Sequence, residues 1–205
     1  HQSDKDTKFV FSSSSSVYGG ANILPAPESH PKNPKSPYAL HKSVIEDYCR
    51  VYSETYDLDT VCLRYFNVFG PGAAGAGAYC TAIAAWIHAI KNGLPMRSDG
   101  NGTQSRDLCP VENVVHANIL AMEYSQKLNG DCFNVACGDR TTNKEILEYF
   151  TNKFPNAKIE HAPWRAGDVM HTHADISKSR EILGYEPQIR FWEALKNTIK
   201  EELGE

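Results

Sequence analysis

The stretch at residues 8–20, KFVFSSSSSVYGG, decides the fold, because five serines follow directly after an apolar run. A serine run by itself is typical of a flexible linker. The apolar run before it instead predicts a short buried strand over Lys8–Phe11, followed by Ser12, Ser13 and Ser14. Ligands of open α/β sheets bind outside the carboxyl ends of the strands. We therefore expect these serines to line a binding site rather than to tether two domains.

Strand and helix patterns alternate along the rest of the chain. After a proline-rich loop, Ser36 and Pro37 have the residue types of a helix N-cap and a first helical position. Further strands are predicted over 60–66 and 132–136, and further helices over 79–91, 111–124, 142–150, 177–183 and 191–203. This alternation indicates an α/β fold with a mostly parallel sheet.

The composition of the 205 residues, 41% hydrophobic and 22% charged, is that of one globular domain or two small ones. The net charge of −4, without long runs of one sign, argues against a nucleic-acid partner or an anionic membrane. The six cysteines form no CxxC pair, so we expect reduced thiols and a cytoplasmic location rather than a zinc site. His171 and His173 alternate without an obvious third ligand, so no metal is expected. No apolar run reaches the roughly 18 residues of a membrane span, and we recognise no signal peptide.

Tyr38 and Lys42 lie four residues apart in the helix predicted after Pro37. At about 3.6 residues per turn, the two side chains share one face of the helix. A phenol is a poor base at neutral pH, but a cation one turn away favours its phenolate form, so such a pair can supply a general base. Without other signals, the pair is better explained as an exposed lysine beside a half-buried tyrosine. The series SSSSSVYGG, SPYALHK and LRYFNVFGPG is far more specific.

Several segments together resemble the extended short-chain dehydrogenase/reductase family, in particular its UDP-sugar 4-epimerases. They are FVFSSSSSVYG, SPYALHKSVIEDY, LRYFNVFGP, GNGTQSRDL with VENVVHANILA, FNVACG and RAGDVMHTHADISKSREILGYEP, and they run from about residue 8 to the end. Within the family, the chain looks most similar to the branch that acts on UDP-N-acetylglucosamine and related hexosamines. The resemblance implies the C-terminal part of a doubly wound Rossmann-type parallel sheet plus a smaller α/β substrate-binding lobe.

The resemblance also implies two lobes within the chain. Residues 1–70 would form the second half of the NAD-binding Rossmann domain, and residues 71–205 the lobe that binds the UDP-sugar. Within the second range, residues from about 107 to 138 would return to the Rossmann sheet.

Individual residues take roles from the same resemblance. Tyr38 would be the catalytic base, Lys42 would bind the nicotinamide ribose and tune that base, and Ser14 would hydrogen-bond the reacting oxygen of the sugar. These three residues would form the catalytic group and, together with Phe66, would contact NAD. The remaining substrate contacts would come from Asn67, from Arg106 and Arg165 on the diphosphate, from Asp168 on the uridine ribose and from Thr172 beside the sugar.

The diphosphate assignment also makes physical sense from the residues alone. Two guanidiniums suit a pyrophosphate, since each offers a planar fork of donors. Outside the matching series, Arg106 beside Asp107 would read as a surface ion pair, and Arg165 as a solvated loop charge. Asp168 would then be a plain turn residue.

The implied reaction is NAD-dependent 4-epimerisation of a UDP-hexose or UDP-N-acetylhexosamine. Tyr38 would remove the proton of the C4 hydroxyl, directly or through Ser14, while hydride passes from C4 to NAD. The transient 4-keto sugar would turn over and take the hydride back on its opposite face, with no net oxidation. Dehydratase relatives carry Thr-Asp-Glu where this chain has Ser14-Ser15-Ser16, so dehydration is disfavoured. Thr172 matches a gatekeeper position, where a small residue leaves room for an N-acetyl group.

Two other functions remain open at this point. One is a UDP-glucuronate epimerase or decarboxylase, which the sequence does not separate from the leading reading. The other is a non-catalytic module that binds nucleotide sugars or assembles with a partner. The presence of Ser14, Tyr38 and Lys42 together argues against this second alternative.

One family motif has no counterpart in this chain. The family opens with a strand and Gly-x-x-Gly-x-x-Gly, whose backbone receives the NAD pyrophosphate at a helix N-terminus. The glycine-rich run GPGAAGAG at residues 70–77 follows the wrong strand to serve that purpose. We therefore expect the chain to correspond to the C-terminal two-thirds of an epimerase, whose full-length form would be a homodimer.

The first prediction concerns the cofactor. Because the pyrophosphate-binding motif is not matched, we expect residues 1–205 to bind NAD poorly and to turn over little sugar by themselves. Isothermal titration of the chain with NAD measures this directly. Tight binding would show that the unmatched motif is dispensable.

Overall fold

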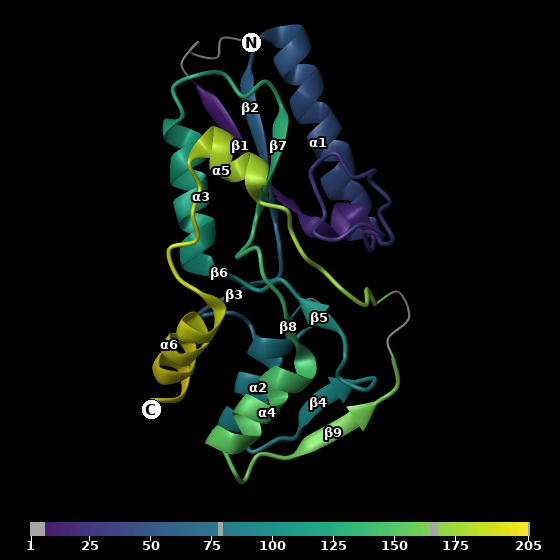
Figure 1. The fold of residues 1–205 in the computed structure, drawn as a ribbon, viewed down its shortest axis with the longest axis vertical. Helices are drawn as coiled ribbons and strands as arrows, with labels where there is room; N and C mark the ends of the chain where they lie inside the picture. The colour runs from purple at the N-terminus through teal and green to yellow at the C-terminus, as the bar shows by residue number, and fades with distance from the viewer. Residues whose placement is uncertain (1–6, 78–79, 165–167, 205) are drawn as a thin grey trace.

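A computed structural model describes residues 7–77, 80–164 and 168–204 of the chain. The elements fall into two groups along the long axis of the molecule (Figure 1). One group surrounds a three-stranded sheet, and the other surrounds a two-stranded sheet near the C-terminus (Figure 1). Each group has its own hydrophobic core.

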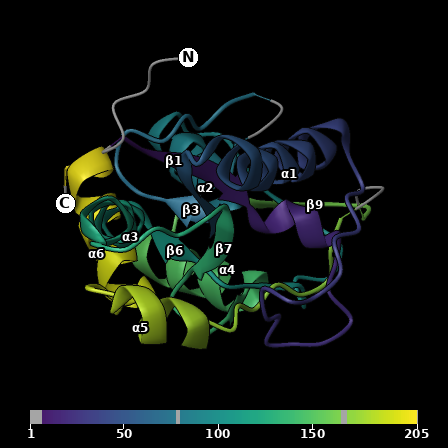
Figure 2. The ribbon, with the colours of Figure 1, turned by 90° about the horizontal axis from the view of Figure 1, so that it is seen from above.

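The larger sheet is parallel, with the strand order β1-β2-β7. Its strands are β1 (Lys8–Ser14), β2 (Asp59–Tyr65) and β7 (Asp131–Val135). Helix α1 (Pro37–Tyr56) packs on one face of this sheet. Helices α3 (Val111–Glu123) and α5 (Ser177–Leu183) pack on the other, as the view from above shows (Figure 2). The fold is therefore α/β with a parallel sheet between helical layers, as the sequence predicts.

The two faces of this sheet differ in chemistry. Val61 and Leu63 of β2 point into the apolar core shared with α3 and α5. Cys62 and Arg64, which alternate with them, point to the opposite face, where Arg64 meets Glu46 of α1. One face is thus hydrophobic, and the other is built on polar and thiol side chains.

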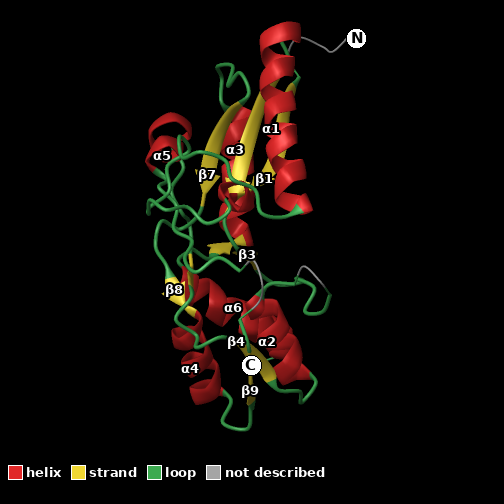
Figure 3. Cartoon of the chain, turned by 90° about the vertical axis from the view of Figure 1, so that its right-hand side faces the viewer, coloured by secondary structure: helices red, strands yellow, loops and turns green. Residues whose placement is uncertain are grey.

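The second group of elements carries a separate core. Strand β4 (Met96–Asp99) pairs in parallel with β9 (Ile159–Ala162). Helices α2 (Ala82–Lys91), α4 (Asn143–Lys153) and α6 (Phe191–Leu203) enclose the core (Figure 3). Its largest buried side chains are Trp86, Phe150, Phe69, Ile83, Met96, Ile146, Leu195 and Ile199.

Short strand pairs lie between the two groups. Strand β3 (Val68–Phe69) pairs in parallel with β6 (Cys109–Pro110), and β5 (Ser105–Arg106) pairs antiparallel with β8 (Thr141–Thr142). A single 3-10 turn, η1 (Ser15–Tyr18), follows β1 directly.

Local capping signals explain where several helices begin. The Ser36 hydroxyl accepts a hydrogen bond from the Ala39 amide at 3.1 Å, and Pro37 opens α1 as expected. Thr142 and Glu145 form a reciprocal capping box at the start of α4. Gly184 ends α5 in the left-handed conformation.

Some predicted boundaries are wrong. The strand predicted over Lys8–Phe11 continues to Ser14, because the serine backbone stays in register with β2. Nor is this strand fully buried, since β1 lies at the end of the strand order and Phe9 is 48% exposed. The helix predicted over 79–91 begins at Ala82, because the Thr81 hydroxyl caps the Ala84 amide; Tyr79 lies outside the described residues.

Helix α1 presents an apolar face to solvent. Five apolar side chains at helical spacing are each between 39% and 59% exposed: Leu40, Val44, Tyr48, Val51 and Tyr52. A contiguous apolar face of this kind is typical of a surface that another element or chain covers. Within the described ranges, none of the helices combines the length and apolar content that a bilayer crossing requires.

A buried ion pair holds α1 against the sheet. The guanidinium of Arg64 on β2 donates to both carboxylate oxygens of Glu46 on α1, each at 2.8 Å. Glu46 and Arg64 are only 3% and 4% exposed. The Ser13 hydroxyl of β1 donates to the same carboxylate at 2.6 Å, so the pair joins two strands and a helix.

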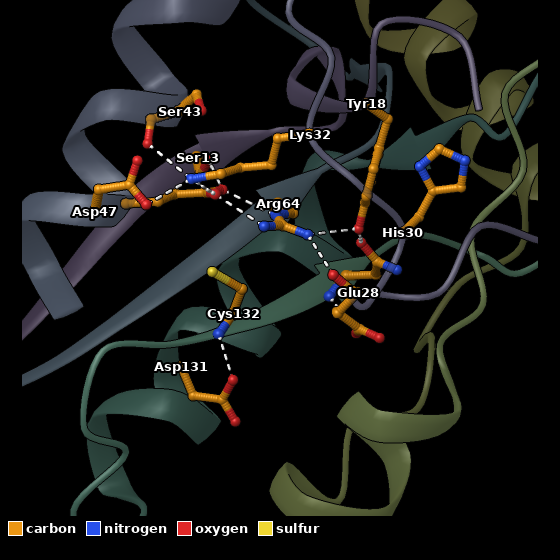
Figure 4. A network of polar contacts seen from close by, with 12 residues as sticks. Ser13, Tyr18, Glu28, His30, Lys32, Ser43, Asp47, Arg64, Asp131 and Cys132 are labelled. Carbon is orange, nitrogen blue, oxygen red and sulfur yellow. Dashed lines mark hydrogen bonds and ion pairs between the residues drawn. The ribbon is translucent and has the colours of Figure 1, made fainter.

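The same guanidinium extends the network to the loop after η1. It donates to the Tyr18 hydroxyl at 2.9 Å and to the Glu28 carbonyl at 3.0 Å (Figure 4). Burial by itself would lower the pKa of Arg64, but hydrogen bonds to Glu46 and nearby negative charge raise it above its usual range. Burial also raises the pKa of Tyr18 to about 12, so this hydroxyl stays protonated.

Removing the cation should strongly destabilise the fold. An Arg64→Leu variant removes the bidentate partner of the buried Glu46 carboxylate and leaves it the Lys32 ammonium at 3.7 Å, so we expect a loss of about 3–5 kcal/mol in free energy of unfolding. Arg50→Leu is a matched control, because Arg50 pairs with Glu54 on the exposed surface of α1 and should cost less than about 1 kcal/mol. Urea unfolding measures both. Equal losses in the two variants would contradict the structural role of the buried pair.

Candidate active site

A cavity of about 480 Å³ lies where β1 and β2 end. Its walls come from η1, the first turn of α1, the residues after β2, and residues 168–173. The residues that the sequence singles out and that line this cavity are Ser14, Tyr38, Phe66, Asn67, Arg106, Asp168 and Thr172. The sequence therefore predicts side chains that the fold brings together from distant positions.

Ser14 sits at the junction between strand and turn. Its backbone is extended, and its hydroxyl accepts a hydrogen bond from the Ser16 amide at 3.2 Å, which makes it the N-cap of η1. The cap fixes the direction of the Ser14 side chain at the edge of the cavity. The Ser16 hydroxyl, also on the cavity wall, is buried without a hydrogen-bond partner among the described residues.

Tyr38 and Lys42 occupy the first turns of α1 on one face. Tyr38 lines the cavity and is 43% exposed. The Lys42 ammonium lies 5.5 Å from the centroid of the Tyr38 ring, and it donates to the Ser12 carbonyl at 2.7 Å. Lys42 itself does not line the cavity, but its position on the same face of α1 as Tyr38 is what the four-residue spacing predicts.

Asn67 takes a left-handed backbone conformation with φ of 34° directly after β2. Its side-chain nitrogen donates to the Asp107 carbonyl at 3.1 Å and to the Thr172 hydroxyl at 2.8 Å. The Thr172 hydroxyl also accepts from the Asp107 amide at 3.1 Å. The hydrogen bond between Asn67 and Thr172 fixes both side chains. The side-chain oxygen of Asn67 and the hydroxyl hydrogen of Thr172 can then contact a ligand.

Residues 168–174, which we call the strap, run alongside residues 105–107. The Ser105 amide donates to the Met170 carbonyl, the Thr172 amide to the Ser105 carbonyl, and the Asp107 amide to the Thr172 carbonyl, each at 3.0 Å. These bonds hold the strap in an extended form across the cavity. They join positions more than 60 residues apart in the chain, so sequence patterns give no hint of them.

Arg106 and Asp168 form an ion pair across this junction. The guanidinium donates to the Asp168 carboxylate at 2.7 Å and to the carbonyls of Ser105 and Met170. Burial lowers the pKa of Arg106, while the Asp168 charge opposes that shift. The pair puts a desolvated cation at the cavity wall. Arg165, the second predicted arginine, lies outside the described residues.

Three residues at or beneath the cavity wall were not among the predicted site residues. Tyr18 lines the cavity, and its hydroxyl donates to the Asn134 side chain at 2.7 Å. His171 lines it too, with Nδ1 2.8 Å from the Ser105 hydroxyl. Asp107 lies beneath the wall with no exposed surface, and burial raises the pKa of its carboxyl to about 7. The sequence points to Asp107 only through its position next to Arg106, which is predicted to contact the substrate.

A comparison with family models now places the chain. Residues 1–136 match the model described as the NAD dependent epimerase/dehydratase family. The chain belongs to this family. NAD is therefore the cofactor associated with its fold, and the resemblance read from its motifs is confirmed.

Individual relatives of this epimerase/dehydratase chain agree with the assignment. It is 33% identical over 196 residues to a UDP-glucose 4-epimerase of Mycolicibacterium smegmatis, covering 92% of this chain and 60% of the relative. It is similar to the structure of a UDP-N-acetylglucosamine 4-epimerase from Methanobrevibacter ruminantium in complex with UDP-N-acetylmuramic acid. That match has a TM-score of 0.88 and 37% identity, and covers 96% of this chain and 63% of the other.

A third relative was solved with the cofactor. The UDP-glucose 4-epimerase of Thermus thermophilus, in complex with NAD, matches with a TM-score of 0.85 and 29% identity, over 96% of this chain and 64% of that one. The chain spans between 58% and 62% of the length of the first curated relatives it matches.

The buried Asp107 carboxyl should give the stability of the fold a distinct pH dependence. Its pKa of about 7 in the native state exceeds the ordinary value near 4 of an unfolded chain, so the native state retains a proton that the unfolded state has lost. This group therefore lowers the free energy of unfolding as pH rises from about 4 to about 7. Asp107→Asn removes the titration, so its stability should fall less over that range in urea unfolding at several pH values.

The exposed Asp47 on α1 provides the control for this measurement. An Asp47→Asn variant should keep the wild-type slope, because the Asp47 side chain is 58% exposed. Parallel pH curves for wild type and Asp107→Asn would show that the buried carboxyl does not titrate in this window.

Proposed function

We propose that the protein catalyses NAD-dependent 4-epimerisation of a UDP-sugar, with a UDP-N-acetylhexosamine as the preferred substrate. The observation that carries this proposal is the convergence of Ser14 and Tyr38 on one cavity, with the Lys42 ammonium against the Tyr38 ring. This group combines a hydroxyl, a phenol and a fixed cation, as proton transfer at a sugar hydroxyl requires.

The shape of the surface supports an elongated ligand. A second hollow of about 500 Å³ adjoins the first, and the two share Asn67, Thr81, Arg106 and Asp168. A sugar beside Tyr38 and a nucleoside in the second hollow would place their diphosphate at this shared wall. The Arg106 guanidinium suits that group, because its planar fork of donors matches phosphate oxygens.

The same residues divide the work of the reaction. Tyr38 would accept the proton of the C4 hydroxyl, and Ser14 would orient that hydroxyl toward the phenol oxygen. Lys42 would keep a positive charge beside the phenol ring, since its ammonium is fixed by the Ser12 carbonyl. Arg106 would keep the UDP in place while the sugar turns over.

The donor set also fits the ribose and nicotinamide end of NAD. Lys42, the hydroxyls of Ser14 and Tyr38, and the unpartnered Ser16 hydroxyl all lie near the carboxyl end of β1, and Phe66 lies close by. When bound, NAD supplies reversible hydride acceptance from the sugar carbon. The chain contributes position and proton transfer.

Two features support the choice of substrate and reaction. Thr172 has a small side chain on the cavity wall, which leaves room for an N-acetyl group. Ser14, Ser15 and Ser16 offer hydroxyls but no carboxyl group, so the acid and base that dehydration needs are missing from these positions. The solved relative from Methanobrevibacter ruminantium is named for a UDP-N-acetylhexosamine substrate, which supports the same choice.

The assembly and location of the whole protein are part of this proposal. The apolar face of α1 supports a homodimer of the full-length enzyme, in which this face would be covered. The reduced state of the six cysteines supports a cytoplasmic enzyme.

Two substitutions should separate chemistry from binding. Tyr38→Phe removes the proton acceptor, so any conversion of UDP-N-acetylglucosamine to its 4-epimer in the presence of NAD should fall at least about a hundredfold. Its affinity for the same UDP-sugar should change little. Arg106→Met should instead lower that affinity at least about tenfold, because a charged hydrogen-bond partner is lost.

Product analysis by nuclear magnetic resonance and isothermal titration measure these two effects. Arg180→Met is the control for charge, because Arg180 pairs with Glu186 on the exposed surface of α5. UDP-glucose and UDP-glucuronate serve as competing ligands. Failure of the wild-type chain to bind any of the three UDP-sugars would contradict the proposal.

A further inference from the structure

Asp107 forms hydrogen bonds to three segments at or near the cavity. Its amide donates to the carbonyl and the hydroxyl of Thr172 in the strap, and its carbonyl accepts from the Asn67 side chain. Its carboxyl accepts from the Cys137 amide, just beyond β7, and from the Ala174 amide at the end of the strap, each at 3.1 Å. One residue thus ties the strap to the sheet and to the residue after β2.

The two backbone amides determine which side chain can stand at this position. One carboxyl oxygen faces Cys137 and the other faces Ala174, so the side chain must offer two acceptors. An aspartate provides them at this length, whereas an asparagine offers one oxygen and would turn a donor toward the other amide. The requirement for a carboxyl is therefore geometric.

A carboxyl at this place lies in surroundings that disfavour its charge. No ion pair within residues 7–77, 80–164 and 168–204 involves Asp107. Burial and the charge of Asp139 both raise its pKa, and Cys109, Cys137 and Tyr185, which also interact with it, are not cations. Burying such a group opposes folding. We therefore infer that its hydrogen bonds to the Cys137 and Ala174 amides are needed to position the residues of the cavity wall.

We propose that Asp107 is the positioning residue that sets the strap, and with it Thr172 and Asp168, in the geometry that receives a UDP-sugar. This inference rests on the proposed function of the cavity. Asp107 does not touch the cavity, since it does not line it and has no exposed surface. It acts through Thr172 and Asp168 of the strap. It also acts through its neighbour Arg106, whose guanidinium forms an ion pair with Asp168.

Amide hydrogen exchange of an Asp107→Asn variant tests the positioning role without any ligand. The variant keeps the size of the side chain but can satisfy only one of the two amides. We expect exchange at Ala174 or Cys137 to become at least about tenfold faster, while the amides of β1 and β2 keep their protection. Wild-type protection at both amides in the variant would overturn the proposal.

Binding of UDP-N-acetylglucosamine tests the consequence for the cavity. We expect the affinity of Asp107→Asn to fall at least about fivefold, and that of the exposed control Asp47→Asn to stay at the wild-type value. If the wild-type chain binds no UDP-sugar, the proposed function fails, while the exchange result still decides the role of Asp107. Unchanged affinity together with faster exchange would also overturn the proposal, because the strap geometry would not matter for the ligand.

A pH profile distinguishes positioning from a general loss of stability. The carboxylate of Asp107 offers an acceptor to each of the two amides, whereas protonation turns one of its oxygens into a donor. Wild-type affinity should therefore be higher at about pH 8 than at about pH 6. A general loss of stability would act in the opposite direction, because Asp107 lowers the free energy of unfolding as pH rises toward about 7. His171 and His173 also line the cavity, so the part of the profile that Asp107→Asn removes is the part that belongs to Asp107.

A second measurement applies if Asp107→Asn does not fold. In the wild-type chain, UDP-N-acetylglucosamine should then increase the protection of the Ala174 and Cys137 amides from exchange. Both amides donate to Asp107, and neither residue lines the cavity. Protection that increases only at residues lining the cavity would contradict a coupling through Asp107.

Discussion

The ion pair between Glu46 and Arg64 is the constraint on which the rest of the structure depends. It is buried, bidentate and tied by Ser13 to a second strand, so α1 can dock on the sheet in only one position. That position sets where Tyr38 stands relative to the end of β1, since Tyr38 is eight residues before Glu46 on the same helix. A structural charge pair therefore determines the geometry of a candidate catalytic group that it does not touch.

The two faces of the large sheet divide stability from function. The face covered by α3 and α5 is apolar and close-packed, which favours folding through burial alone. The face under α1 carries the Arg64 network, the Ser13 hydroxyl, and the thiols of Cys62 and Cys132, and Cys62 meets Cys49 of α1. The directional hydrogen bonds on this face fix the orientation of α1 on the sheet, whereas apolar contacts alone would allow the helix to shift along it.

The sequence predicts those parts of the fold that rest on local signals. Ser36, Pro37 and the Thr142–Glu145 box mark helix starts, because capping is decided within a few residues. The β4–β9 pairing was not predicted, because it joins residues 96 and 159 and each strand has only four residues. A lone arginine in the apolar run TVCLRYF indicates a buried partner, but spacing does not show that the partner is Glu46, which lies 18 positions away.

The candidate site follows the same rule. The Tyr38–Lys42 spacing predicts a shared helical face because both residues belong to one element. The strap and Asp107 were not predicted as a unit, because their hydrogen bonds cross from residues 105–107 to residues 168–174. Pattern reasoning finds side chains that carry chemistry more readily than the side chains that hold them in place.

The edge position of β1 has a consequence for the size of the cavity. Within the described residues, β1 pairs with β2 on one side, so the backbone amides and carbonyls of its other side face outward. A further strand adding in parallel along that side would end level with Ser14. Its last side chains would then extend the wall beyond the serines, enlarging the chamber while every contact now made by Ser14, Tyr38 and Arg106 stays as it is.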